Sequence, residues 1–303
     1  MRPSGDQIEI NYADQRAVIT EVGAALRVYE AGGVAVVEGW DVDEMADACR
    51  NQVCYPWINR TASGQWSYSG RTADVGADNV VKQTLNHGVV RWRPFLLESR
   101  SESACTMSLV LHPVPEYPFA SRFTVTYELG RDGLSVTSRV DNLDKVDIPF
   151  SLGFHPYFAV TTAGIDGSSL TVPARSYLEV DDRLLPTGET KDVDGTVMDF
   201  RHARLVDGVV FDVTFTDLER DPDGLFRCRV VDARGGEVVL FQDESFPYFQ
   251  VFSGDTLPEA RRRTSIALEP MTAPADALRS GRGLLSVAPG QSWSARWGVA
   301  RLR

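Results

Sequence analysis

The amino-acid sequence predicts an all-β protein folded as a large antiparallel β-sandwich. Short runs rich in β-branched and aromatic residues recur along almost the whole chain, bounded by Gly, Pro, Asp and Asn. Alternation of apolar and polar residues is frequent, whereas the 3.6-residue periodicity of amphipathic helices is scarce. So many strands with so few crossover helices favour sheets packed on sheets.

The clearest element is a hairpin with strands at residues 122–129 and 134–142, joined by a turn over 130–133. Every second residue of its first strand is apolar, which predicts one buried face and one solvated face. Further strands are expected at residues 208–218, 226–233, 237–243, 248–254, 264–270 and 292–300.

The remaining segments are expected to be short helices and loops. Only residues 41–51 and 274–281 have a helical pattern, and the Gly- and Asp-rich stretch 181–199 predicts a long surface loop. The chain has no internal repeat and no low-complexity linker. Because 303 residues fit within one large β-sandwich, a single domain over residues 1–303 is expected.

Composition excludes several classes of partner. The chain has 31 basic and 42 acidic residues, a formal net charge of −11, which argues against binding to nucleic acid or to an anionic membrane surface. No stretch approaches the roughly 18 apolar residues of a membrane span, and the N-terminal segment lacks the apolar core of a signal peptide. These features predict a cytoplasmic protein, either a monomer or a homodimer.

The four cysteines are expected to be reduced and mostly buried. They form no C-x-x-C pair, and their irregular spacing favours neither a zinc knuckle nor a disulfide framework. Accordingly, no metal ligand is predicted. The cysteines are Cys49, Cys54, Cys105 and Cys228.

The four histidines differ in their settings. His202 lies among charged residues and is expected at the surface, while His112 ends a strand before a proline turn and is expected to be a hydrogen-bonded structural residue. His155 lies in GFHPYF, where an ionisable ring among aromatic residues indicates either a satisfied core histidine or a sugar site. His87 lies in LNHGVVRW, where the neighbouring glycine favours a loop or strand end facing a cleft.

Five motifs in order resemble those of the aldose 1-epimerase (galactose mutarotase) family. They are Asn59-Arg60, LNHG at 85–88, GFHPYF at 153–158, FPYFQVFSG at 246–254 and SIALEPMTAPADA at 265–277. The resemblance runs from about residue 8 to the C-terminus and implies the galactose mutarotase-like supersandwich. It also implies interconversion of the α and β anomers of a free aldohexose without a cofactor.

The resemblance assigns roles to seven residues. Glu269 matches the general base and His155 the general acid, whereas the other five match substrate-binding positions. These five are Arg60, Asn86, His87, Asp212 and Gln250. The sequence departs from the family's common motifs in two places. It has LNHGVV in place of Leu-His-Gly-Gly, and Asp212-Val213 in place of Asp-His or Asp-Asn. These departures indicate a divergent bacterial branch, so the resemblance predicts the reaction class better than the substrate.

The chemistry fits these two residue types. Opening a hemiacetal ring removes the proton of the C1 hydroxyl and donates one to the ring oxygen, which a carboxylate and an imidazolium can do together. Glu269 must then be ionised and His155 protonated. We therefore expect a nearby carboxylate to raise the pKa of His155 above its usual value of about 6.5.

Three alternative functions remain open from the residues alone. A hexose 6-phosphate epimerase would need extra cations near the pocket, for which Arg71, Arg91 and Arg93 are candidates, although solvated strand residues explain them as well. A non-catalytic sugar-binding protein would be expected to lose the acid or the base. A glycosidase needs two carboxylates that flank one bond, and the sequence offers Glu269 with Asp212 as an uncertain second.

Overall fold

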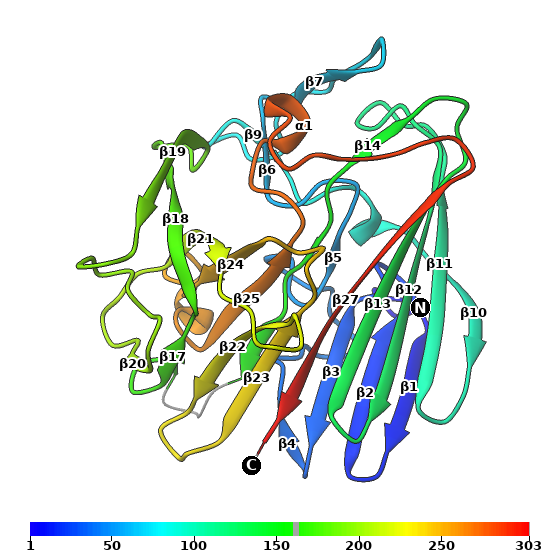
Figure 1. Ribbon diagram of the computed structural model, residues 1–303. Coiled ribbons are helices and arrows are strands. Elements are labelled where there is room, and N and C mark those ends of the chain that lie inside the picture. The colour runs from blue at the N-terminus through cyan, green and yellow to red at the C-terminus, as the bar shows by residue number, and fades with distance from the viewer. Residues whose placement is uncertain (160–163, 303) are drawn as a thin grey trace.

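Two large antiparallel sheets dominate the computed structural model, which describes residues 1–159 and 164–302 (Figure 1). The first sheet has nine strands in the order β10 (Leu96–Arg100), β11 (Ala104–Leu111), β12 (Ser121–Gly130), β13 (Gly133–Asn142), β27 (Ser292–Arg301), β23 (Glu237–Gln242), β22 (Phe226–Val231), β17 (Ser169–Thr171) and β20 (Arg204–Leu205). The second sheet has eight strands. Seven follow the order β19 (Pro186–Asp192), β18 (Ala174–Val180), β21 (Asp212–Leu218), β24 (Tyr248–Phe252), β25 (Ser265–Met271), β15 (Gly153–Phe154) and β5 (Val53–Cys54), and β16 (Tyr157–Ala159) also pairs with β25.

Smaller elements complete the fold. A four-stranded sheet contains β1 (Gln7–Tyr12), β2 (Gln15–Thr20), β3 (Leu26–Ala31) and β4 (Val34–Ala35). Three two-stranded ladders join β6 (Arg60–Ala62) to β9 (Thr84–Asn86), β7 (Gln65–Tyr68) to β8 (Arg71–Asp74), and β14 (Ile148–Phe150) to β26 (Leu285–Val287). The helical elements are α1 (Ala277–Ser280) and the 3₁₀ turns η1 (Val90–Trp92) and η2 (Glu259–Arg261).

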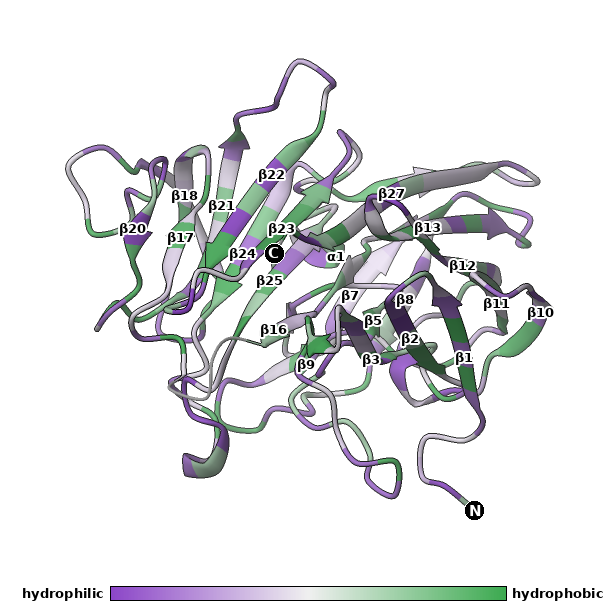
Figure 2. Cartoon of the chain, turned by 90° about the horizontal axis from the view of Figure 1, so that it is seen from below, coloured by the Kyte–Doolittle hydropathy of each residue, from purple (hydrophilic) through white to green (hydrophobic). Residues whose placement is uncertain are grey.

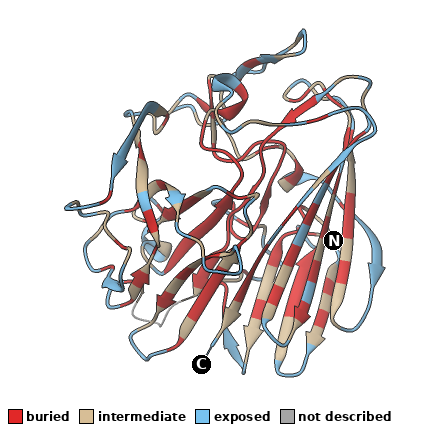
Figure 3. Ribbon diagram, viewed as in Figure 1, coloured by how far each residue is buried: buried red, intermediate tan, exposed pale blue. Residues whose placement is uncertain are grey.

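Aromatic side chains fill the space between the two large sheets. Phe226 of β22 packs on Phe249 of β24 with ring centroids 5.0 Å apart, and Phe154 of β15 packs on Trp297 of β27 at the same distance. Burial of such side chains is the main stabilising term of a sandwich. Figure 3 shows buried residues along the inner strands and exposed ones on the outer strands β10 and β19. The predicted all-β antiparallel sandwich is therefore confirmed.

The four-stranded sheet packs beside β11 and β12 (Figure 1). The hydroxyl of Tyr127 in β12 donates a hydrogen bond to the carbonyl oxygen of Ala24, which fixes this sheet against the nine-stranded one. At its outer edge the nine-stranded sheet ends in β10, whose register with β11 shifts between Leu97 and Ser99.

The predicted hairpin is confirmed, with β12 and β13 paired from Ser121 opposite Asn142 to Gly130 opposite Gly133. Burial alternates along both strands, as the sequence pattern requires. The six further strands are also present as β21 to β25 and β27. β21 begins only at Asp212, because Gly208 has a φ of 70° and the Val209 amide closes a turn onto the Val206 carbonyl.

β25 differs from the alternating strands because all seven of its residues are buried. It lies between β24 and β15 in the middle of the second sheet, and hydrophobic colour covers much of its length in Figure 2. A charged residue in such a strand needs a partner, and Glu269 is in this position.

Two sequence predictions about local structure are wrong. Residues 41–51 form turns instead of a helix, because the Asp41 carboxylate accepts the Asp43 amide and because Cys49 and Asn51 have positive φ. Residues 181–199 contain β19, which pairs with β18 in an exposed hairpin where a loop was expected. The helix expected over 274–281 is present as the shorter α1.

Two histidines lie outside the cavity described below. His202 is exposed, as predicted. His112 is also exposed, directly after β11, so its expected structural role is wrong: the turn that follows the strand leaves the ring in solvent.

The part of the chain that the structure describes contains no helix of the length and apolar character needed to span a membrane. A single domain over residues 1–303 stays a prediction.

Gly88, two residues after the end of β9, is a position where a side chain should not fit. Its φ is +66°, and an added Cβ would lie 2.1 Å from the Tyr55 carbonyl oxygen, which accepts the amides of Val89 and Val90. We expect Gly88→Ala to lower the free energy of unfolding by about 3 kcal/mol. Gly290 has a φ of +71° with open space around it, so Gly290→Ala should cost only about 1 kcal/mol. Urea denaturation measures both, and equal losses would contradict the steric argument.

Candidate active site

The register of three strands places a row of polar side chains on one face of the eight-stranded sheet. Thr214 of β21 lies opposite Gln250 of β24, which lies opposite Glu269 of β25. Residues directly opposite each other in a sheet point to the same face, as do residues two positions apart on one strand. Asp212, two residues before Thr214, therefore joins the same row.

Hydrogen bonds fix the order of this row. The Gln250 Nε2 atom donates to Asp212 Oδ1 at 2.6 Å, and the Thr214 hydroxyl donates to Gln250 Oε1. The Gln250 amide is thereby held in one orientation, with Asp212 on one side of it and Glu269 as its cross-strand neighbour on the other. Asp212 keeps its Oδ2 atom for a second partner.

That second partner comes from the β6–β9 ladder, in which Arg60 pairs with Asn86. Arg60 Nη2 lies 3.3 Å from Asp212 Oδ2, and Arg60 Nη1 donates to Asn59 Oδ1 at 2.8 Å. His87 follows β9 with a φ of 58°, and its amide donates to the Asn59 carbonyl at 2.9 Å. Left-handed backbone at a residue other than glycine is costly and often accompanies a functional site.

His155 lies between β15 and β16 and faces Glu269. Its amide donates to the Gln52 carbonyl and its carbonyl accepts the Asn51 amide, so the backbone is held from both sides. The Nε2 atom of His155 lies 3.3 Å from Glu269 Oε1. The imidazole stacks on the Tyr157 ring at 5.0 Å and meets the His87 ring edge-on at 5.3 Å.

A cavity of about 550 Å³ opens in front of these groups. All seven residues predicted for the site line it: Arg60, Asn86, His87, His155, Asp212, Gln250 and Glu269. The structure thus brings together every predicted site residue, from segments as far apart as 60 and 269. Their individual catalytic and binding roles stay predictions.

Six buried polar atoms of cavity-lining residues have no hydrogen-bond partner among the described residues. They are Arg60 Nε, Asn86 Oδ1, His87 Nδ1, Arg91 Nε, His155 Nδ1 and Glu269 Oε2. Buried polar atoms are nearly always satisfied in native proteins, so a group of unsatisfied ones marks a place where a polar ligand or water binds.

Burial sets the protonation of the central pair. It lowers the pKa of His155 to about 3 and raises the pKa of Glu269 well above its usual value, with the charge of Asp212 adding to the latter. The expectation that His155 has a raised pKa is therefore wrong. Desolvation of the imidazolium is the main cause, and the nearby positive charges of Arg60, Arg91 and Arg261 lower the pKa of His155 further.

The two groups are in contact, so the protonation of one affects the protonation of the other. With one proton between Glu269 Oε1 and His155 Nε2, either the carboxylic acid beside a neutral ring or the carboxylate beside an imidazolium gives zero net charge. The low pKa of His155 and the high pKa of Glu269 both favour the uncharged arrangement when the cavity holds no ligand.

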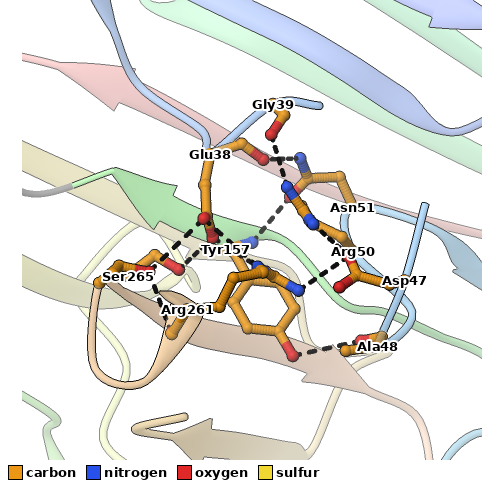
Figure 4. Close-up of polar contacts among 10 residues, drawn as sticks. Glu38, Gly39, Asp47, Ala48, Arg50, Asn51, Tyr157, Arg261 and Ser265 are labelled. Atoms are coloured by element: carbon orange, nitrogen blue, oxygen red, sulfur yellow. Dashed lines mark hydrogen bonds and ion pairs between the residues drawn. The ribbon is translucent and has the colours of Figure 1, made fainter. Parts of the chain in front are cut away.

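A polar network behind His155 holds the stacked Tyr157 in place (Figure 4). The Tyr157 amide donates to Asn51 Oδ1 at 2.8 Å, and its hydroxyl donates to the Ala48 carbonyl at 3.2 Å. The guanidinium of Arg261 lies over the ring, 5.3 Å from its centroid, and forms ion pairs with Glu38 and Asp47. The turn whose Ala48 and Cys49 line the cavity is thereby tied to Tyr157 of β16 and to Arg261 of η2.

Of the three arginines considered for a phosphate, only Arg91 lines the cavity. Arg71 forms a two-pronged ion pair with Asp144, and Arg93 is exposed outside the cavity lining. Arg91 contacts Asp78 at 3.5 Å and the Asn86 carbonyl at 3.3 Å.

All four cysteines are buried free thiols, as predicted. Cys49 lines the cavity, and Arg91 Nη1 lies 3.4 Å from its Sγ atom. Contact with Cys54 and the charge of Arg91 lower the pKa of the Cys49 thiol.

Sequence reasoning missed Cys49, Asp78 and Tyr157 as lining residues. Tyr157 had a signal, since it lies two residues from His155 inside the same aromatic motif. Cys49 and Asp78 had none, because both reach the cavity through irregular turns whose path depends on tertiary contacts.

Comparisons with known proteins agree with this architecture. A family model described as aldose 1-epimerase matches residues 6–299. The uncharacterized protein YihR of Escherichia coli is 28% identical over 293 residues, which cover 96% of this chain and 92% of that protein. Galactose mutarotase of Sus scrofa is 30% identical over 215 residues, which cover 66% of this chain and 60% of the pig protein.

Solved structures share the fold. A GalM/aldose epimerase homologue from C. elegans superposes with a TM-score of 0.87 at 18% identity, covering 98% of this chain and 99% of that one. Galactose 1-epimerase from Lactobacillus acidophilus superposes with a TM-score of 0.80 at 16% identity, covering 99% and 96% of the two chains.

The lowered pKa of His155 predicts a loss of stability in acid. Its folded pKa of about 3 lies below the unfolded value of about 6.5, so its contribution is present above pH 6.5 and is lost as the pH falls toward 3. We expect the free energy of unfolding to fall between pH 6.5 and 4 more steeply in the parent than in His155→Gln, by up to about 1.4 kcal/mol per pH unit. Urea denaturation across this range measures the slopes. The control His202→Gln, at an exposed histidine, should keep the parental dependence of the unfolding free energy on pH. The same dependence in His155→Gln would refute the lowered pKa of His155.

Proposed function

Because the chain belongs to the aldose 1-epimerase family, we propose that it interconverts the α and β anomers of a free aldohexose such as glucose or galactose. The observation that carries this proposal is the contact of 3.3 Å between His155 Nε2 and Glu269 Oε1, beside a cavity rich in hydrogen-bonding groups. A sugar ring offers hydroxyls on its rim and apolar C–H faces, which such a cavity can accept.

The reaction requires two proton transfers in each direction. Glu269 removes the proton of the C1 hydroxyl while His155 donates a proton to the ring oxygen, so the C1–O5 bond breaks and the open-chain aldehyde forms. Rotation about C1–C2 presents the other face of the aldehyde to O5. Closure then returns the proton to the C1 oxygen from Glu269 and moves the O5 proton back to His155.

The coupled pair is suited to this exchange because its proton count is the same in both anomeric complexes. The reactive form has the shared proton on His155 and the negative charge on Glu269. Sugar hydroxyls that donate to Glu269, together with the charge of Arg60, favour this form by stabilising the carboxylate. Ligand binding would thus convert the uncharged pair into the reactive one.

The remaining groups supply orientation. The Arg60–Asp212 ion pair offers a donor and an acceptor to the cavity, and Asn86 Oδ1 and His87 Nδ1 add two atoms without a partner among the described residues. Several fixed hydrogen-bonding groups around one sugar ring can hold C1 and O5 next to the acid and the base. Such positioning increases the rate of the reaction.

A hexose 6-phosphate is a weaker candidate substrate. A phosphate dianion favours several convergent cations, whereas Arg71 is engaged with Asp144 and Arg91 is near Asp78. The carboxylates of Asp78 and Asp212 also line the cavity and would repel a dianion. A non-catalytic sugar-binding protein is disfavoured because both the acid and the base are present and in contact.

Removing either member of the pair should abolish most of the catalysis. We expect Glu269→Gln and His155→Asn each to lower kcat by about 10²- to 10⁴-fold, since each removes one of the two proton transfers. The exposed Glu128→Gln is the matched control and should retain parental activity. Rates are measured by polarimetry of fresh α-glucose and α-galactose, with circular dichroism to verify folding. A variant of the pair with unchanged kcat would show that the residue is not the acid or base.

The choice between neutral and phosphorylated sugars can be measured directly. NMR exchange spectroscopy should show faster anomeric equilibration of glucose or galactose with the protein than without it, and a kcat/KM for glucose 6-phosphate at least tenfold lower. A higher kcat/KM for the phosphorylated sugar would favour the alternative substrate. No acceleration of any of the three sugars would refute the proposed activity.

A further inference from the structure

Three metal-binding side chains converge in the wall of the cavity. The Cys49 Sγ atom, the Cys54 Sγ atom and a ring nitrogen of His87 all lie within 4.8 Å of one another. They come from separate segments: Cys49 from the turn at 48–51, Cys54 from β5, and His87 from the residue after β9. The spacing in sequence gives no metal motif, because His87 reaches the two cysteines only in the folded chain.

The donor set matches the preference of soft divalent ions. Zinc binds thiolate sulfur at about 2.3 Å and imidazole nitrogen at about 2.0 Å, which places the ligand atoms of a tetrahedral site about 3.5–4 Å apart. Movements of about 1 Å in the side chains would bring these three atoms to that spacing. Two sulfurs and one nitrogen leave the fourth position for water or another ligand.

Burial and access fit such a site. Cys54 is fully buried, whereas Cys49 and His87 line the cavity, so an ion could enter from the cavity and would keep its open position toward it. The backbone at both Cys49 and His87 is left-handed, with φ of 57° and 58°. The Nδ1 atom of His87 is buried without a partner among the described residues.

The charges around the three side chains do not forbid a cation. Arg91 lies 3.4 Å from the Cys49 sulfur, and its positive charge opposes an ion there. The Asp78 carboxylate lies 3.5 Å from the same guanidinium and offsets part of that charge. Two thiolates formed by loss of their protons would neutralise the ion itself.

We propose that Cys49, Cys54 and His87 form a binding site for a soft divalent metal ion such as Zn²⁺ in the wall of the cavity, and that the bound ion blocks the sugar. The ion would engage His87 and fill part of the space in front of His155. The site is therefore inhibitory. The inhibition by the bound ion rests on the proposed function, whereas metal binding by itself does not.

Binding is tested on the reduced protein with the metal alone. Titration with Zn²⁺ in a calorimeter, and with Cd²⁺ followed by the ultraviolet absorption of cadmium–thiolate bonds, should give one ion per chain. Cys54→Ser should bind at least about tenfold more weakly, because it loses a direct ligand. Cys228→Ser makes the same change at a fully buried cysteine of β22 and should bind like the parent. Parental binding by Cys54→Ser, or no binding by the parent, would overturn the site.

Inhibition is a separate measurement. Zn²⁺ should lower the mutarotation rate of the parent and of Cys228→Ser, with the loss reversed by a chelator, while Cys54→Ser should be resistant. Cys54 does not line the cavity, so its variant should keep its basal activity. Tight binding without inhibition would overturn the blocking role alone. Tight binding by a protein that is inactive on every sugar would leave the metal site intact and refute the proposed function instead.

Discussion

The fixed register of β21, β24 and β25 is the constraint on which the candidate site depends. Each strand contributes a polar residue to the same face, because the pleat turns Asp212, Gln250 and Glu269 to one side while Phe215, Phe249 and Leu268 point to the core on the other. A slip of one residue in any pairing would move an ionisable group into the sandwich interior. The hydrophobic core and the polar site therefore enforce the same register, since each alternative arrangement would bury a charge and expose an aromatic ring.

The interior of the sheet also determines the electrostatics of the site. A carboxyl group and an imidazole held in a dry strand-rich wall cannot both be charged at low cost unless they are in contact. The geometry meets this condition by placing Glu269 and His155 next to each other, so that one proton satisfies both. In the proposed mechanism, the proton affinity of this pocket is a property of the pair, and the bound sugar would decide how the proton is shared.

Sequence patterns predicted the regular parts of this fold and the members of its site, but not the irregular paths between them. The period-two alternation of β12 and β13 could be recognised in the sequence because each strand has one buried face. The motifs around His155 and Glu269 could be recognised because polar residues interrupt apolar runs. The turn at residues 41–51 was misread as a helix because its alternation of acidic and apolar residues resembles an amphipathic pattern, whereas Asx bonding and positive φ decide its shape. The protonation of His155 could not be read at all, since it depends on burial and on arginines that are distant in sequence.

The outer edge of the nine-stranded sheet bears on how the molecules behave at high concentration. β10 is an exposed edge strand, and its unpaired backbone groups would ordinarily offer a template for a strand of another chain. The shift in register between Leu97 and Ser99 interrupts a regular edge, and Glu98 and Arg100 place charges beside it. The opposite edge ends in β20, which is only two residues long. Extension of this sheet from one molecule to the next is therefore hindered at both of its edges.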